Sequence, residues 1–462
     1  MQVSTLSQSL ALRQSINDMR AQFDDLQRQL STGLKTDSYA KLGTDRNSVL
    51  SLTHQLGQIS AYTNTISKTQ MRIEVMSTTL TRVNDIVSET KTSLATSGFE
   101  LVNGTQTSAQ VQAAMTFDEM VNLLNLQVED RYLFGGKDTQ TRPVALRSAG
   151  TTVTLAEDAD PSVFGFKIAA VQSTLSNASV TGPAGSPQGA DVDFTGLPAA
   201  GETISFALNL PDGTATTVTL KATTNNPAEA GEFTIGGDAT ATSANFQAAL
   251  DTAIQREANV TLRAASAVEA ADNFFDYAAG GLPQRVDGPP FGTATGLRDA
   301  TADDTVIWYS GDLGPNAGKD FVAQIDESRQ LAYGARADQA SIRDTLKMSA
   351  LLAAAEYSDA DDLEQRDSYR ALTSRAGQVL NFKGVQSVES IVTNLGLAAS
   401  TLSHTQDRHD ATMASANEIL GDIQNADAYE VGVKLTTLQT QLQASFQVTS
   451  LLSQLSLVNY IR

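Results

Sequence analysis

The chain has 462 residues and carries 52 Asp and Glu against 32 Lys and Arg, a formal charge of -20 at pH 7. This balance argues against nucleic acid as a partner, because neutralising phosphates requires clustered cations; it favours solubility and makes copies of the chain repel one another. No cysteine is present, which excludes disulfides and thiolate metal sites, and the low aromatic content of 6% suits long helices better than a dense enzyme core.

The first region, residues 1–143, is predicted to be helical. Its apolar residues alternate steps of three and four over residues 16–30 and, after a glycine-containing break at 34–45, again over residues 49–87. Such spacing over many heptads predicts long helices in a coiled-coil-like bundle. A shorter helix is expected from Val121 to Tyr132, ending at a pair of glycines.

The middle region, residues 144–336, changes character and contains every proline except Pro143 at its border. Short runs of alternating polar and apolar residues predict strands. These runs are residues 151–155, 191–197, 201–210, 215–222 and 231–237. The Pro211-Asp212-Gly213 sequence predicts a turn between two of them, and a helix is expected over residues 243–254. We therefore expect one or two small β-rich domains inserted between the helical regions.

The third region, residues 337–462, contains no proline and returns to the helical spacing. Two helices are expected, over residues 388–409 and 435–452, with a break at residues 425–430. The predicted fold class is α+β: a long antiparallel coiled-coil-like bundle made by both termini, with the C-terminal region packing on the N-terminal one and the β-rich part inserted between them.

No group of residues predicts catalysis, a cofactor or a metal site. His54, His404 and His409 lie in heptad-patterned helices, and His404 and His409 are five residues apart, which does not place them on one helix face as metal ligands. The acidic residues at 359–364 lack the glycine and the ligand spacing of a calcium loop, so a solvated helix N-terminus is expected. The candidate cluster Trp308–Asp312 is interpreted as a strand-end turn, because no base accompanies it. We expect no enzyme.

The two ends of the chain are unusual because they are helical and almost free of charge. Residues 1–12 contain no charged side chain, and none occurs between Lys434 and Arg462. Two such helices alone would be marginal in water, since tertiary packing supplies most helical stability. They become stable if neighbouring copies bury the remaining faces, where uncharged polar groups avoid the desolvation penalty of buried charges.

Four short motifs at the two ends resemble the bacterial flagellin family, which includes filament flagellin and the subunit of the hook–filament junction. Gln29–Gly33 is similar to the family's motif after the first helix, and Asp427–Glu430 to the acidic–Tyr step before the last one. Tyr132–Gly136, followed by Pro143, and Leu455–Tyr460 resemble the junction type.

The resemblance implies a structural subunit of the extracellular bacterial flagellum that assembles through its terminal helices. It implies export through the flagellar type III apparatus without a cleaved signal peptide, folding at the distal tip, and an outward-facing middle region. The implied partners are copies of the chain, neighbouring hook-associated, filament and cap proteins, and an export chaperone. Neither nucleic acid nor a membrane span is expected, because no run of about 18 apolar residues is present.

For the assembly interface we expect an apolar set on each terminal helix. These residues are Leu6, Leu10, Ile16, Met19, Phe23, Leu26, Leu435, Leu438, Leu442, Phe446, Leu452 and Leu455. A junction subunit is preferred to a filament flagellin, because residues 37–45 lack the family's usual acidic filament motif. A secreted adhesin with a ligand site in the middle region is the alternative from a different class.

Overall fold

The computed structural model describes the backbone of residues 2–145, 165–185, 188–277, 281–288, 296–301, 303, 305–315, 319 and 321–460. Within these ranges, side chains are described except at residues 2–6, 8–9 and 452–460. The strand expected at residues 151–155 lies outside the described residues.

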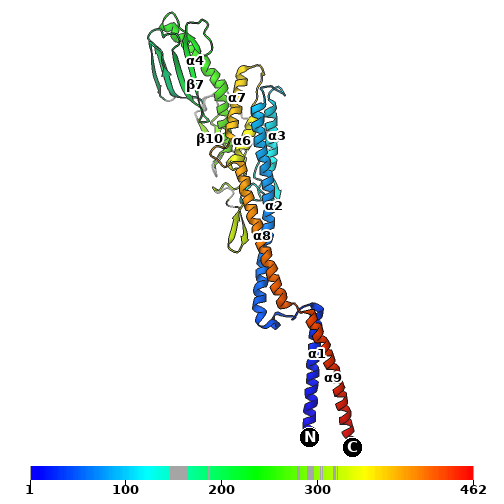
Figure 1. The fold of residues 1–462 in the computed structure, drawn as a ribbon. Helices are drawn as coiled ribbons and strands as arrows, with labels where there is room; N and C mark the ends of the chain where they lie inside the picture. Colours follow the sequence, from blue (N-terminus) through cyan, green and yellow to red (C-terminus); the bar gives the residue numbers. More distant parts are fainter. Residues whose placement is uncertain are drawn as a thin grey trace. The chain divides into compact units, whose positions relative to one another are not determined.

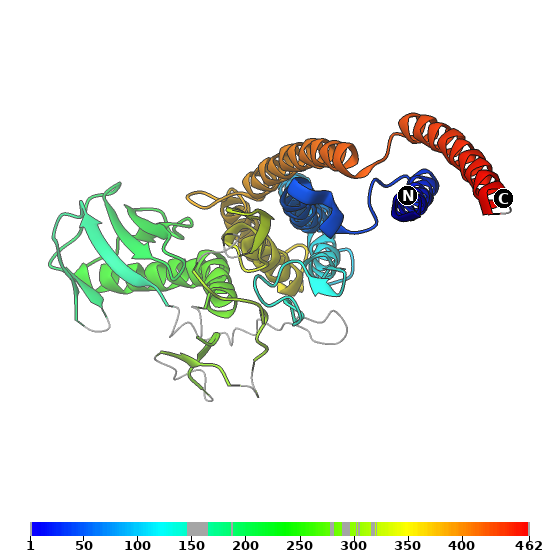
Figure 2. The same cartoon turned by 90° about the horizontal axis from the view of Figure 1, so that it is seen from below.

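Long helices from both ends of the chain lie side by side. From the N-terminus these are α1 (Gln2–Thr32), a short 3-10 helix η1 (Tyr39–Asp45), α2 (Arg46–Thr96) and α3 (Ser108–Leu124); from the C-terminal side they are α8 (Val388–Gln424) and α9 (Ala428–Tyr460). Helix α1 runs antiparallel to α9 and α2 antiparallel to α8, so that both chain ends lie together (Figures 1 and 2). This arrangement confirms the predicted fold class.

The packing of α2 and α8 follows from the heptad spacing. The buried side chains of α2 and α8 recur at steps of three and four, which places them on one face of each helix. They include Val49, Ile59, Ile66, Ile73, Met76, Leu80, Val83 and Val87 on α2, and Val388, Ile391, Leu395, Ala398 and Leu402 on α8. The sequence predicted all of these positions.

The helix expected from Val121 to Tyr132 is wrong beyond Leu124. Strands β1 (Gln127–Val128) and β2 (Arg131–Tyr132) form a hairpin there. The Asn125 side chain explains the break: its amide donates to the Val144 carbonyl at 2.9 Å and accepts from the Val144 N–H at 3.0 Å. An Asn side chain bound to backbone in this way competes with helix continuation. Glu129 and Asp130 then take positive φ and make the turn.

A β-rich domain with its own core is inserted in the chain between the two helical ends, and we call it the outer β domain. Its main sheet has the order β3-β6-β7-β8, with β3, β6 and β7 antiparallel and β8 parallel to β7, and β4 pairs separately with β5. The strands are β3 (Lys167–Ser173), β4 (Ala178–Ala184), β5 (Gly189–Phe194), β6 (Thr203–Asn209), β7 (Ala215–Thr223) and β8 (Glu232–Thr234). The predicted turn at Pro211-Asp212-Gly213 joins β6 to β7, as expected.

Helix α4 (Ala239–Glu257) packs on this sheet and includes the helix expected over residues 243–254. Phe246 from α4 meets Phe194 and Phe233 from the strands, with ring centroids 5.5 and 5.3 Å apart in edge-to-face geometry. Ile204, Phe206, Leu208, Val218 and Leu220 complete this core. The period-two alternation of β6 and β7 thus buries one face against α4 and leaves the other half-buried on β6 and mostly exposed on β7.

Three further helices build a second core with α2 and α3. These are α5 (Arg263–Phe275), α6 (Ala340–Ala354) and α7 (Leu363–Val379); a π-helical segment, η2 (Ala258–Leu262), joins α4 to α5. Their buried cluster includes Val268, Met348, Leu351, Leu372 and Leu380. Helix α5 was not predicted, because its buried face consists largely of alanine and so gives a weak hydrophobic period.

Two hairpin-like strand pairs complete the described elements: β9 (Gln284–Val286) with β10 (Leu297–Asp299), and β11 (Val322–Asp326) with β12 (Arg329–Ala332). Within the described residues, no helix combines the length and apolarity needed to cross a membrane.

By their contacts, the residues form two units. One contains residues 1–68, 324–330 and 401–462, and the other contains residues 69–323 and 331–400. The domain boundaries expected at residues 143 and 336 stay a prediction, because these units are defined by contacts and divide both α2 and α8.

Candidate assembly interface

Helices α1 and α9 face each other along a narrow seam. Ile16 on α1 and Val431 and Leu438 on α9 are buried there, the only such residues among the described side chains of these two helices. The flanking positions of the seam are half-buried. They are Met19, Phe23 and Leu26 on α1, and Leu435, Leu442, Ser445 and Thr449 on α9. The three-four spacing therefore places seven of the expected interface residues on this seam.

Other expected interface residues point away from the seam. Leu10 is 58% exposed and Phe446 is 44% exposed. Val448 and Leu451, which are not among the expected interface residues, are exposed as well. Leu6, Leu452 and Leu455 lie outside the described side chains. The pair of helices thus keeps a substantial part of its apolar surface in contact with solvent.

One contact covers part of this surface. The Arg20 guanidinium lies over the Phe446 ring, 5.3 Å from its centroid. Cation–π contacts of this kind contribute roughly 0.5–1 kcal/mol at exposed sites. Arg20 therefore ties α1 to an aromatic side chain of α9 outside the seam.

The solvent-facing surface of α9 is less polar than its composition suggests. Its last ion pair joins Lys434 to Glu430 at 2.5 Å. Beyond it, the hydroxyls of Thr436, Thr437 and Thr440 each donate to the backbone carbonyl four residues earlier, at 2.9–3.0 Å. Because these donors are satisfied within the helix, burying the threonine methyl groups against a neighbour leaves no hydroxyl hydrogen without an acceptor.

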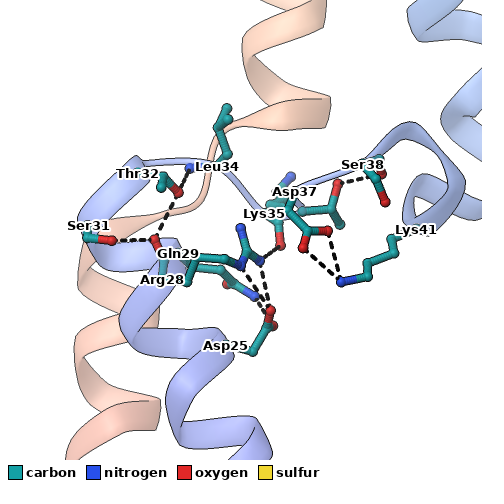
Figure 3. Close-up of polar contacts among 11 residues, drawn as sticks. Asp25, Arg28, Gln29, Ser31, Thr32, Leu34, Lys35, Asp37, Ser38 and Lys41 are labelled. Atoms are coloured by element: carbon teal, nitrogen blue, oxygen red, sulfur yellow. Dashed lines mark hydrogen bonds and ion pairs between the residues drawn. The ribbon is translucent and has the colours of Figure 1, made fainter.

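An elbow connects the α1–α9 pair to α2 and α8, and two chain segments cross there (Figure 3). Leu34 bridges Asn425 in antiparallel fashion. The Lys35 N–H donates to the Gln424 carbonyl at 2.7 Å, and the Ala426 N–H donates to the Gly33 carbonyl at 2.8 Å. We call this pairing of residues 33–35 with 424–426 the clasp.

Side chains reinforce the clasp. The Lys35 ammonium donates to the Asp422 carbonyl at 2.5 Å, one of the carbonyls that the end of α8 leaves free. Arg28 donates to the Lys35 carbonyl at 3.2 Å and pairs with Asp25 at 2.8 Å (Figure 3). This Arg28 contact holds the pKa of the Asp25 carboxyl below its usual range. The cation at the end of α8 also complements the negative end of the helix dipole.

Backbone conformation explains why the clasp begins at Gly33. This residue has a φ of 71° and its N–H donates to the Gln29 carbonyl at 2.8 Å, which ends α1 with a left-handed cap. On the other segment, the Asp427 carboxylate accepts from the Tyr429 N–H at 2.8 Å and caps the start of α9. The family-like motifs at Gln29–Gly33 and Asp427–Glu430 are therefore the two helix caps of the elbow.

The three histidines lie in the long helices α2 and α8. His54 and His404 are exposed, whereas His409 is buried, stacks on the Tyr62 ring at 6.0 Å and hydrogen-bonds through Nε2 to the Ile325 carbonyl at 2.8 Å. The contact with Ile325, which lies in strand β11, could not be found from spacing along α8. No group of three or more potential metal ligands occurs among the described residues.

The other segments considered for chemistry are structural. Asp362, from the acidic run, caps α7 by accepting from the Glu364 and Gln365 N–H groups. Trp308 is buried and its indole N–H donates to the Phe275 carbonyl at 3.0 Å. Gly135, in the family-like Tyr132–Gly136 motif, has no room for a side chain, because a Cβ would collide with the Asp138 carbonyl. These roles agree with the interpretations as helix start, core contact and turn.

Comparison with known families agrees with this architecture. Residues 3–139 match the bacterial flagellin N-terminal helical region, and residues 383–461 match the bacterial flagellin C-terminal helical region. The second match starts after the end of α7. No curated protein matches the chain. The matched segments contain α1, α2 and α3 at one end and α8 and α9 at the other.

Flagellins are structural proteins that self-assemble into the polymers of the extracellular flagellum, which drives motility. The two matched regions stand at the two ends of the chain, in family order, and form the paired helices described above. The chain is therefore a member of the bacterial flagellin family and a structural subunit of the flagellum.

Proposed function

We propose that this chain is the subunit of the hook–filament junction and that it assembles through α1 and α9. The observation that carries the assembly role is the incomplete burial of these two helices. Leu10, Phe446 and Leu451 are exposed, and the outer face of α9 beyond Lys434 carries no charge. Apolar surface of this kind is stabilised when neighbouring subunits cover it, at about 25 cal/mol per Å² removed from water.

The junction assignment rests on two sequence segments. Tyr132–Gly136 and Leu455–Tyr460 resemble the junction type, and residues 37–45 depart from the usual filament motif. The tight packing of Gly135 against the Asp138 carbonyl gives a physical reason for glycine in the first segment. The implied neighbours are hook-associated, filament and cap proteins.

The proposal includes three domains and a route of export. Residues 1–143 and 337–462 form the two assembly domains, and residues 144–336 form the outward-facing part. Export without a cleaved signal peptide requires an unfolded chain and an export chaperone, and the weakly stabilised terminal helices suit an unfolded state before assembly. The absence of cysteine means that no disulfide opposes unfolding.

Electron microscopy with gold-labelled antibody tests the junction assignment. A junction subunit gives one cluster of label at the base of each filament and trace amounts in sheared flagella. Deleting its gene releases filament subunits into the medium, and restoring the full chain reverses this. Label along whole filaments would contradict the junction assignment.

A truncated chain tests the assembly role of α9 independently of the position of the subunit in the flagellum. The chain ending at Lys434 lacks most of α9, so we expect it to be exported but not incorporated. Normal incorporation of this truncated chain would contradict the assembly role of α9, whichever position in the flagellum the subunit occupies.

Filament flagellin is the second candidate. The observation that favours it is the large outer part between the two family matches, residues 140–382, which makes the chain long for a junction subunit. In that case the protein would dominate sheared flagella, and its deletion would remove the filament itself.

A further inference from the structure

The outer β domain and the helical core beside it are joined by one run of helix. Phe246 on α4 belongs to the core of the β domain, whereas Val268 and Ala271 on α5 belong to the core formed with α2, α3, α6 and α7. The π-helical segment η2 lies between α4 and α5. The helix therefore passes from one hydrophobic core into the other at residues 258–262.

This segment is a point where a helix can bend. A π-helical turn interrupts the regular i to i−4 hydrogen bonds, and such turns are a recognised cause of helix kinks. With η2 as its sole attachment, the β domain would be able to change its direction relative to the helical core. Whether the β domain does change its direction depends on any second contact that it makes with the helical core.

The turn between β6 and β7 supplies that second attachment. The Asp212 carboxylate accepts from the Arg375 Nε–H of α7 at 2.7 Å, and Arg375 Nη2 donates to the Thr214 hydroxyl at 3.1 Å. The side chains of Asp212 and Arg375 are only 4% and 13% exposed. Thr214 also donates to Asp212 through its backbone N–H and its hydroxyl. The carboxylate is thus buried with a full set of donors.

Neighbouring contacts hold the turn on η2 and α5, and hold α4 and η2 on α7. Leu210, at the start of the turn, packs with Leu262 and Ala265 in a small buried cluster. Arg256 pairs with Asp367 at 3.2 Å, and Asn259 donates to Glu364 at 3.0 Å. These two contacts are exposed, and exposed pairs contribute little. Losing one partner of a buried pair costs much more, because the other charge stays buried and unpaired.

We propose that the Asp212–Arg375 pair is a latch that fixes the direction of the outer β domain on the helical core. With the pair intact, the turn is fixed to α7 as well as to the pivot at η2, where Leu210 packs on Leu262 and Ala265, and the domain projects rigidly. Without the pair, the turn leaves α7 and the domain swings about η2. This role concerns the presentation of the outer domain and does not depend on whether the subunit belongs to the junction or the filament.

Spin-label distances test the latch in the full-length chain. Because the chain contains no cysteine, Thr217→Cys on the exposed face of β7 and Gln378→Cys on α7 give one defined label pair. The native pair should give one narrow distance distribution. Arg375→Met should replace it with a broad distribution, in which the undocked population rises by about tenfold or more.

Two companion variants keep the result interpretable. Arg370→Met removes a cation from the same helix, but this side chain is 67% exposed and its nearest oxygen on Asp367 is 3.7 Å away, so the distribution should stay narrow. Asp212→Asn keeps an oxygen acceptor for Thr214 and removes the charge, so it tests the latch if Arg375→Met does not fold. Narrow distributions in both Asp212→Asn and a folded Arg375→Met, or a broad one in the native pair, would overturn the proposal.

Discussion

At the scale of single residues, the most unusual feature is a buried lysine surrounded by carboxylates. Lys347 on α6 is 5% exposed and lies 2.5 Å from Asp272 and 3.0 Å from both Asp276 and Asp344. Burial disfavours its charge, but these three carboxylates outweigh that effect and raise its pKa. Burial, together with Asp276 and Asp344, raises the pKa of Asp272 despite the attraction of Lys347. Arg343 also pairs with Asp276, at 2.6 Å, so two cations face three carboxylates.

This cluster predicts a pH-dependent loss in Lys347→Met. At neutral pH the variant leaves the partly buried Asp272 and Asp344 without their cation, whereas Asp276 keeps Arg343, so we expect a loss of about 2–3 kcal/mol in the free energy of unfolding, less than for a fully buried pair. Asp272 has a raised folded-state pKa, so its protonated form is favoured on folding and its contribution is lost as the pH rises through that value. The deficit of the variant should therefore shrink from pH 7 towards pH 5. Urea unfolding between pH 5 and pH 7 measures this deficit, and Lys383→Met, which replaces an exposed lysine, is the control. A deficit that is absent or independent of pH would contradict the prediction.

At the scale of elements, the clasp sets how α1 and α9 meet. The seam itself has three buried residues among its described side chains, which is little for two helices of more than 30 residues each. The two backbone hydrogen bonds of the clasp fix one end of the pair, so the seam can form from a defined starting point. Heptad spacing predicted the two helices and their apolar faces, but the clasp follows from a contact between residues almost 400 positions apart, which local patterns do not contain.

A proline pair tests the clasp. Ala426→Pro removes the N–H that donates to Gly33, whereas Ala428→Pro places proline at the first position of α9, where helices accept it. We expect faster hydrogen exchange along α1 and α9 in Ala426→Pro, by about two- to tenfold, as for the loss of one backbone hydrogen bond worth roughly 0.5–1.5 kcal/mol. Ala428→Pro should exchange like the native chain. Equal acceleration in both variants would show that the clasp is not the cause.

At the scale of the whole molecule, the residues expected to mediate assembly differ from those that form the hydrophobic clusters of the fold. The hydrophobic clusters of the outer β domain and of the helices around α5–α7 are built from residues between Val87 and Leu380. Helices α1 and α9 contribute nothing to these clusters, and their exposed apolar side chains have no role in stabilising them. The terminal helices can therefore be ordered by assembly without changing the rest of the subunit.

A double truncation should separate the two properties. A chain of residues 46–424 lacks α1, the clasp and α9, and we expect its main thermal transition to shift by no more than about 4 °C, equivalent to roughly 1 kcal/mol. The same chain should stay monomeric in sedimentation experiments under conditions in which the full chain assembles. A large fall in the transition temperature would mean that α1 and α9 support the fold itself.

The sequence by itself determined the helical ends, the inserted strands and the assembly character of the termini. Those properties follow from periods of 3.5 and 2 residues and from the distribution of charge, all of which are local along the chain. The tertiary structure alone decided where α3 stops and which distant residues meet. Asn125 ends α3 through Val144, His409 contacts Ile325, and Asp212 meets Arg375, because a side chain finds its buried partner across folded segments rather than along the chain.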